Sequence, residues 1–295
     1  MLQCLEVKTL SILTAIFQAI GQALTFILPI SESGHSAIFH DFSARYSGAN
    51  SILTGLIHIG IAIGIIAAYY NVFIRHIAEF VGCCRDVASK RLDIRNSTPS
   101  RKFTYYTFIP YIFMLFYFIP AGSRGNLYQL FDSFSTDGNL ISEGICFFFT
   151  ASILLLTSFI IKGEQKGRAL TLPVVLILSL MIFITLPFAG LSLSAAIICV
   201  AIICGVNKNF AFRFFVSVAA PVLFVMGIIE IATCVTYTTV IAGILAVVIA
   251  AGISFLACRF LKWSIRNFDF KYYSYYNYAL AVLSLVTGIV EFIIK

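Results

Sequence analysis

A short polar stretch, residues 28–36, holds side chains that could do chemistry. It reads Leu28-Pro29-Ile30-Ser31-Glu32-Ser33-Gly34-His35-Ser36. His35 could act as a nucleophile or general base, with Glu32 orienting it and the hydroxyls of Ser31 and Ser33 beside it. Pro29 favours the end of a helix just before it, and Gly34 allows a sharp turn. The sequence therefore predicts a reactive turn between two helical segments.

The surroundings of this turn are too apolar for a water-soluble protein. Hydrophobic residues make up 60% of the chain and charged residues 11%, against about 25% charged in soluble domains. Several uncharged windows of roughly 20 residues are long enough to cross a bilayer. Their continuous apolar character excludes a β-barrel, whose strands alternate. We expect a polytopic α-helical membrane protein.

The net charge, the cysteine content and the N-terminal segment are also consistent with a membrane protein. The net charge of +7 is better explained by basic cytoplasmic loops than by nucleic-acid binding, so no nucleic-acid partner is expected. The eight cysteines show no metal-ligand spacing and no disulfide framework. The first segment has no basic start and no evident cleavage site, which disfavours a removed signal peptide.

The first half of the chain is predicted to form one hairpin and three spans. The apolar segment before the turn is followed by a second one, Ala37 to about Tyr46, that is too short to span and carries His40. Non-helical backbone at membrane depth is tolerated where it is buried or lines a cavity, so we interpret residues 8–45 as a re-entrant hairpin. The predicted spans are 52–72, 103–121 with a bend at Pro110, and 143–161. A basic cytoplasmic loop covers 71–102, and an external loop covers 122–142.

The second half repeats this pattern. An apolar segment leads to the small-residue turn 188–195, and a short apolar segment follows. Three further spans are predicted at 212–232, 236–257 and 275–294, with Glu230 at an interface and the tyrosines of 272–278 in an interfacial belt. An odd number of crossings inverts the second half relative to the first. The predicted fold is thus an all-α membrane domain, 1–295, with two inverted-topology repeats, 8–161 and 170–294. Each is a re-entrant helical hairpin plus three transmembrane helices, and the two tips meet near the midplane.

Two motifs resemble those of the undecaprenyl-diphosphate phosphatases, also called bacitracin-resistance proteins. The run Gln22-Ala23-Leu24-Thr25-Phe26-Ile27-Leu28-Pro29-Ile30-Ser31-Glu32-Ser33-Gly34-His35 resembles the signature E-G-x-T-E-F-L-P-[IV]-S-S-[ST]-G-H. The run Ala189-Gly190-Leu191-Ser192-Leu193-Ser194-Ala195 resembles P-G-x-S-R-S-G. Weaker matches are Ile57-His58-Ile59-Gly60, the stretch Arg213 to Pro221, and Tyr276-Asn277 in the last helix.

The resemblance implies an activity, a site and a location. Members of the family remove the terminal phosphate of undecaprenyl diphosphate, which recycles the lipid carrier of cell-wall synthesis. The resemblance further implies a bacterial plasma-membrane protein, a polyprenyl diphosphate or phosphate partner, and a divalent cation, Mg²⁺ or Ca²⁺. Gly34, Gly190, Ser192 and Ser194 would bind phosphate. A homodimer is compatible with it.

The departures from the family pattern fall on the residues that do its chemistry. The two signature glutamates are replaced by Gln22 and Phe26, and the signature arginine by Leu193. Phe215 and Asn277 replace a further serine and arginine. Carboxylate oxygen suits a hard cation and guanidinium suits phosphate, so only weak metal ligands, Gln22 and Glu32, remain. These replacements predict strongly reduced hydrolysis.

Purely structural explanations compete with the functional ones for several of these residues. Ser and Gly in an intramembrane turn could serve close packing alone, and His40 and His58 are expected to be structural. Glu32 at membrane depth is a functional candidate by default. The chain as a whole fits three roles: a divergent phosphatase, a polyprenyl-phosphate binder or transporter without catalysis, and a decayed paralogue.

Overall fold

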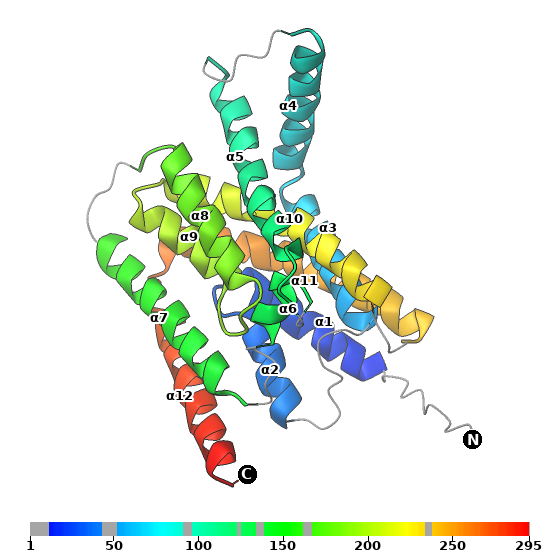
Figure 1. The fold of residues 1–295 in the computed structure, drawn as a ribbon, viewed down its shortest axis with the longest axis vertical. Helices are drawn as coiled ribbons and strands as arrows, with labels where there is room; N and C mark the ends of the chain where they lie inside the picture. Colours follow the sequence, from blue (N-terminus) through cyan, green and yellow to red (C-terminus); the bar gives the residue numbers. More distant parts are fainter. Residues whose placement is uncertain are drawn as a thin grey trace.

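The structure is a computed structural model, and it describes residues 12–42, 52–90, 96–122, 125–133, 139–161, 167–233 and 238–294. Its elements are helices (Figure 1), which confirms the all-α prediction. The predicted short apolar segment was expected to end at about Tyr46, and the predicted hairpin at Arg45. Both of these ends lie outside the described residues. The helices are α1 (Ile12–Ile27), α2 (Glu32–Phe42), α3 (Ile52–Ala68), α4 (Tyr70–Ala88), α5 (Pro99–Met114), a 3-10 turn η1 (Leu115–Phe118), α6 (Leu127–Asp132), α7 (Ile141–Ile161), α8 (Leu172–Thr185), α9 (Leu193–Ile203), α10 (Lys208–Thr233), α11 (Val240–Asn267) and α12 (Lys271–Ile294).

Both predicted hairpins exist as pairs of short helices around a turn. In the first, α1 ends at Ile27 and α2 begins at Glu32, so most of the polar stretch lies in the first turn of α2 rather than in a loop. In the second, α8 ends at Thr185 and α9 begins at Leu193. The helix α1 buries Ala15, Ala19 and Ala23 at four-residue spacing, and this face packs against α11.

Among the described residues, four helices are long and apolar enough to cross a membrane: α7, α10, α11 and α12. The pair α3 and α4 passes the same test as one broken segment with a bend of 88°. The chain is therefore a multi-pass membrane protein. The predicted span 103–121 is not among the candidate spans of the described residues. Its helix, α5, contains Pro110 and gives way to the 3-10 turn η1 after Met114.

The predicted cytoplasmic loop 71–102 was wrong in its secondary structure, because residues 70–88 form the helix α4. Ile74, Ile77 and Val81 recur at helical spacing and are 59%, 64% and 60% exposed. The opposite, polar face turns toward α5, where Arg101 binds the carboxylates of Glu79 and Asp86 at 3.2 and 2.5 Å. The two helices form an arm that extends from the rest of the chain (Figure 1). Likewise, α11 runs on to Asn267, ten residues beyond the predicted end of the span 236–257.

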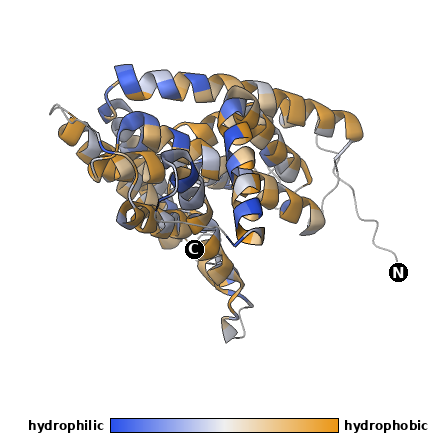
Figure 2. Cartoon of the chain, turned by 90° about the horizontal axis from the view of Figure 1, so that it is seen from above, coloured by the Kyte–Doolittle hydropathy of each residue, from blue (hydrophilic) through white to orange (hydrophobic). Residues whose placement is uncertain are grey.

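The remaining packing places the short helix α9 at the centre of the domain. The helix α3 lies against α10 and α11, α7 lies beside α12, and α5 packs on α8. The helix α9 contacts α7, α8 and α10, and most of its side chains are buried. Hydrophobic residues make up most of the helices (Figure 2), and many large hydrophobic side chains are exposed, as expected for helices surrounded by lipid.

Candidate active site at the hairpin tips

The two hairpin tips touch through a pair of glycines. A Cβ atom added to Gly34 would lie 2.7 Å from the Cα atom of Gly190, closer than real Cβ contacts. Gly190 has φ +93°, and a Cβ there would lie 2.6 Å from the carbonyl oxygen of Glu143 on α7. Both positions therefore require glycine, one for close approach and the other for its backbone conformation as well.

Ser31 joins the first tip to the second. Its Oγ accepts a hydrogen bond from the Gly34 N–H at 3.2 Å, which caps the start of α2. The same hydroxyl donates to the carbonyl oxygen of Leu191 at 3.1 Å. Ser31 adopts φ 63°, a left-handed conformation that is uncommon for a residue with a side chain. The tertiary bonds hold it in this conformation, and such strain is characteristic of functional turns.

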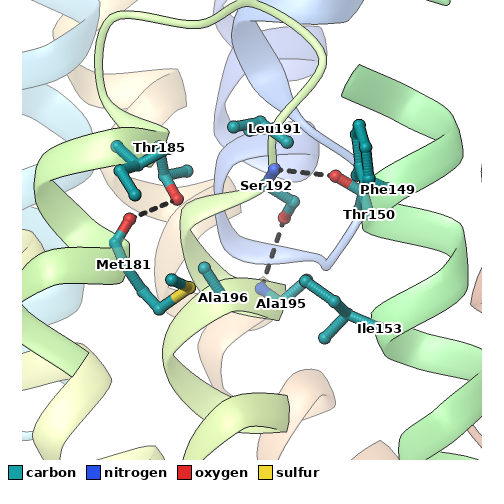
Figure 3. A pocket seen from close by; sticks show the side chains of 10 residues that line it. Phe149, Thr150, Ile153, Met181, Thr185, Leu191, Ser192, Ala195 and Ala196 are labelled. Carbon is teal, nitrogen blue, oxygen red and sulfur yellow. Dashed lines mark hydrogen bonds between the residues drawn. The ribbon is translucent and has the colours of Figure 1, made fainter. Parts of the chain in front are cut away.

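The second tip has an equivalent cap. Ser192 Oγ accepts from the Ala195 N–H at 3.3 Å and lies 3.2 Å from Ser194 Oγ. Thr150 on α7 donates to the Gly190 carbonyl and accepts from the Ser192 N–H, which fixes the turn against α7 (Figure 3). Ser192 is 3% exposed and Ser194 is fully buried. Both predicted phosphate-binding hydroxyls are thus engaged in holding the turn, and their role toward phosphate stays a prediction.

His35 lies in the first turn of α2 with both ring nitrogens in contact. Nδ1 lies 2.7 Å from the Ser31 carbonyl oxygen, and Nε2 lies 2.7 Å from the hydroxyl of Tyr276 on α12. A carbonyl only accepts, so Nδ1 carries the hydrogen, and in the neutral ring Nε2 accepts from the tyrosine. The ring of Phe147 packs edge-on against the imidazole. This tautomer presents Nε2 as the basic nitrogen.

Two residues of α12 complete the tip. Tyr276, which the sequence assigned to an interfacial belt, is instead the partner of His35. Asn277 is fully buried, and its Nδ2 donates to the Pro29 carbonyl at 3.0 Å and to the Tyr273 carbonyl at 2.7 Å. The Tyr276-Asn277 match in the last helix was the signal that could have identified this contact. At this position the chain has a neutral amide bound to the tip backbone.

Glu32 is the first residue of α2, and its carboxylate has two neighbours. Oε1 accepts from Ser36 Oγ at 3.0 Å, and Oε2 lies 3.9 Å from His58 Nε2 on α3. The other nitrogen of His58, Nδ1, lies 2.7 Å from Glu230 Oε2 on α10. His58 was expected to be structural and Glu230 interfacial. The structure places His58 beside the carboxylate of the tip and Glu230 on the other side of the His58 ring.

The predicted metal ligands do not form a recognisable cation site. Gln22 is buried in α1, and Phe26 and Leu193 offer no donor atoms. Within the described ranges, no group of three His, Cys, Asp or Glu side chains could hold a metal ion. Ser33 is half-buried beside Glu32. The divalent cation stays a prediction, and the donor set found here does not fit it.

A cavity of about 220 Å³ opens next to the second tip, between α7, α8 and α9 (Figure 3). Its polar end is formed by Ser192 and Thr150, and its walls are apolar. The wall residues are Phe149, Ile153, Met181, Ile184, Ala195 and Ala196. Such a cavity suits the first part of an apolar chain whose polar head lies at the tips.

Comparison with known proteins gives full-length matches of low identity. The sequence is similar to "Undecaprenyl-diphosphatase" of Methanobrevibacter smithii, with 26% identity over 95% of this chain and 99% of the relative. It is 24% identical to that of Methanosphaera stadtmanae, over 95% of this chain and 99% of the relative. It is 23% identical to that of Streptococcus mutans, over 95% and 97%. Because archaeal proteins are among these relatives, the bacterial membrane stays a prediction.

The family itself follows from a match that covers most of the chain. Residues 15–283 match the family described as bacitracin resistance protein BacA, a range that includes the turns of both hairpins, the spans α7, α10 and α11, and the first part of α12. Predicted resemblance and observed match agree, and the chain belongs to the BacA, or undecaprenyl-diphosphatase, family.

Proposed function

We propose that this protein binds a polyprenyl diphosphate in the membrane and hydrolyses it much more slowly than relatives that keep the signature residues. The observation that carries the proposal is the direct contact of the two tips at Gly34 and Gly190. It brings His35 and the capped starts of α2 and α9 to one place. Backbone N–H groups at helix starts attract phosphate oxygens even where side-chain cations are missing.

The proposed fold behind this site is a pair of inverted repeats. A Cβ on Gly55 of α3 would lie 2.7 Å from the Gly227 carbonyl oxygen of α10, and a Cβ on Gly227 would lie 2.6 Å from that of Gly55. The residues next closest to these Cβ atoms are reciprocal as well. A Cβ on Gly55 would contact Ile231, and a Cβ on Gly227 would contact Ile59. Each isoleucine lies four residues after the facing glycine, as a two-fold axis between antiparallel helices would require.

A second helix pair repeats this reciprocity. A Cβ on Gly144 of α7 would meet Leu285 of α12, and a Cβ on Gly288 would meet Ile141. Each contacted residue lies three positions before the facing glycine. These contacts, with the matching serine caps of α2 and α9, support repeats 8–161 and 170–294 within one domain, 1–295.

The proposed chemistry uses the residues at the tips. His35 is the general base or nucleophile, since its Nδ1–H is held by the Ser31 carbonyl and its Nε2 becomes available when the Tyr276 hydroxyl moves away. Glu32 supplies the carboxylate of the tip. The isoprenoid chain follows the apolar cavity beside Ser192.

The same site explains why turnover should be low. Stabilising charge on a transferring phosphoryl group normally depends on Arg, Lys or a metal ion. Gln22, Phe26, Leu193 and Asn277 supply no charge at this site. We derive no step through a metal ion. Binding without catalysis is the second candidate function, and the proposed two-fold arrangement of the halves suits a transporter.

The proposal is tested with purified protein in detergent and two measurements. Phosphate release from undecaprenyl diphosphate should be slow but detectable, and His35→Ala should abolish it while the exposed His40→Ala leaves it unchanged. Binding of undecaprenyl phosphate should persist in the parent. Binding and flipping without any release would favour the transporter, and absence of both binding and release would overturn the proposal.

A further inference from the structure

Three ionisable side chains from three helices meet beside the first tip. Glu32 begins α2, His58 lies in α3, and Glu230 lies near the end of α10. The imidazole is between the carboxylates, with Nδ1 2.7 Å from Glu230 Oε2 and Nε2 3.9 Å from Glu32 Oε2. The three side chains are only 6%, 13% and 15% exposed for His58, Glu32 and Glu230. Burial of this kind is costly unless the charges compensate one another.

The two carboxylates around the ring favour its doubly protonated form. A neutral imidazole has one N–H donor and one acceptor nitrogen, and a carboxylate only accepts. Each nitrogen of the His58 ring faces a carboxylate oxygen. The ring can donate hydrogen toward both oxygens only when both nitrogens carry hydrogen. His58 is therefore suited to hold a second proton, which leaves the three groups with one net negative charge rather than two.

The other groups around His58 do not compete for this proton. On the side of α1, Gln18 donates its amide to Thr54 of α3, and on the side of α11, Ser254 donates to the Ile61 carbonyl. Neither is ionisable. On α2, His35 follows Glu32 by three residues, and its ring is held by Ser31 and Tyr276. The carboxylate of Glu32 thus faces His58 of α3, whereas the ring nitrogens of His35 have other partners.

We propose that Glu32, His58 and Glu230 form a buried proton-holding site that fixes the orientation and charge of the tip carboxylate. Glu230 holds the imidazolium ring, and the ring offsets the negative charge of Glu32 where phosphate is to bind. His58 and Glu230 are positioning residues, since Glu32 alone of the three lies at the tip. His, Glu and Asp chains inside membrane domains commonly hold and move protons. The role toward phosphate rests on the proposed function, whereas the proton site does not.

The proton site is tested by NMR of protein with ¹⁵N-labelled histidine in lipid nanodiscs. The chain has four histidines, and His58→Gln identifies the signals of interest. We expect both His58 nitrogens to be protonated at pH 7.5 and the ring to become neutral in Glu230→Gln. His76, whose nitrogens lie 2.9 Å from the hydroxyls of Thr104 and Ser217, is the matched control and should not change. A neutral His58 in the parent, or an unchanged one in Glu230→Gln, would overturn the proposal.

The effect on the tip is tested by a double-mutant cycle on binding of undecaprenyl phosphate. His58→Gln leaves Glu32 negative and uncompensated, so affinity should fall on the order of tenfold. Glu32→Gln removes that charge, so the double variant should recover most of the loss. A loss that Glu32→Gln does not relieve would mean that His58 only supports the fold. If the parent binds no phosphate lipid, the proposed function fails, while the NMR result still decides the proton site.

Discussion

Replacing Ser31 tests whether its hydroxyl holds the two hairpin tips together. Ser31→Ala removes the cap on the Gly34 N–H and the bond to the Leu191 carbonyl. A helix cap contributes about 1 kcal/mol, and a buried hydrogen bond contributes about 1 kcal/mol. The free energy of unfolding should therefore fall by about 2 kcal/mol.

A second substitution at the same position separates the hydroxyl from the backbone. Ser31→Gly loses the same two hydrogen bonds but relieves the left-handed φ of 63°. That conformation costs a residue with a side chain about 1–2 kcal/mol. Ser31→Gly should therefore be about 1 kcal/mol more stable than Ser31→Ala.

Unfolding by sodium dodecyl sulfate in mixed micelles, followed by the fluorescence of the single tryptophan and by circular dichroism, measures both changes. The matched control is Ser33→Ala, a half-buried serine of the same turn, for which we expect less than about 0.5 kcal/mol. Equal losses for Ser31→Ala and Ser33→Ala would refute the inter-tip role. A Ser31→Gly variant less stable than Ser31→Ala would refute the strained backbone.

Further predictions concern the same tip. Gly34→Ala should cost about 1–3 kcal/mol, because the methyl group overlaps both the Phe147 ring of α7 and the Gly190 backbone of the second tip. Gly252→Ala has open space and should be neutral or stabilising in the same unfolding assay, and similar losses in both would contradict the close packing at Gly34. Asn277→Ala should cost about 1–2 kcal/mol by leaving the Pro29 carbonyl without its donor, and a cost near zero would argue against that bond. Tyr276→Phe should change the free energy of unfolding by no more than about 1 kcal/mol. It should also shift the ¹⁵N signal of His35 Nε2, because this nitrogen loses the hydroxyl that contacts it. An unchanged signal would contradict the pairing of His35 with Tyr276.

The hairpins could be predicted because their signals are local. Pro29 and Gly34 mark the first turn, and the small residues around Gly190 mark the second, each between apolar runs too short or too interrupted to be ordinary spans. In the predicted span 103–121 the chain changes from α5 to the 3-10 turn η1 after Met114, and an apolar run does not reveal where such a change occurs. The helix α4 was missed because its basic residues suggested a loop, although Ile74 and Ile77 already follow a helical period.

The contacts between distant segments could not be predicted in the same way. His58 and Glu230 are 172 residues apart, and His35 and Tyr276 are 241 apart. No local pattern pairs such residues, since their meeting depends on how α3, α10 and α12 pack. The position of Glu230 near a helix end and the run of tyrosines each had an adequate interfacial explanation. The Tyr276-Asn277 match pointed to the last helix, but only the three-dimensional arrangement shows which tip residues it contacts.

Phosphate release by a restored variant tests the central claim most directly. Gln22→Glu, Phe26→Glu and Leu193→Arg together return the signature carboxylates and guanidinium to the two hairpins. Initial rates of release from undecaprenyl diphosphate are compared with the parent, across a series of divalent cations. The account predicts slow release by the parent and a rate at least about 100-fold higher in the variant, since one charge-stabilising group alone is worth about that factor. Rapid release by the parent, with no gain on restoration, would contradict it.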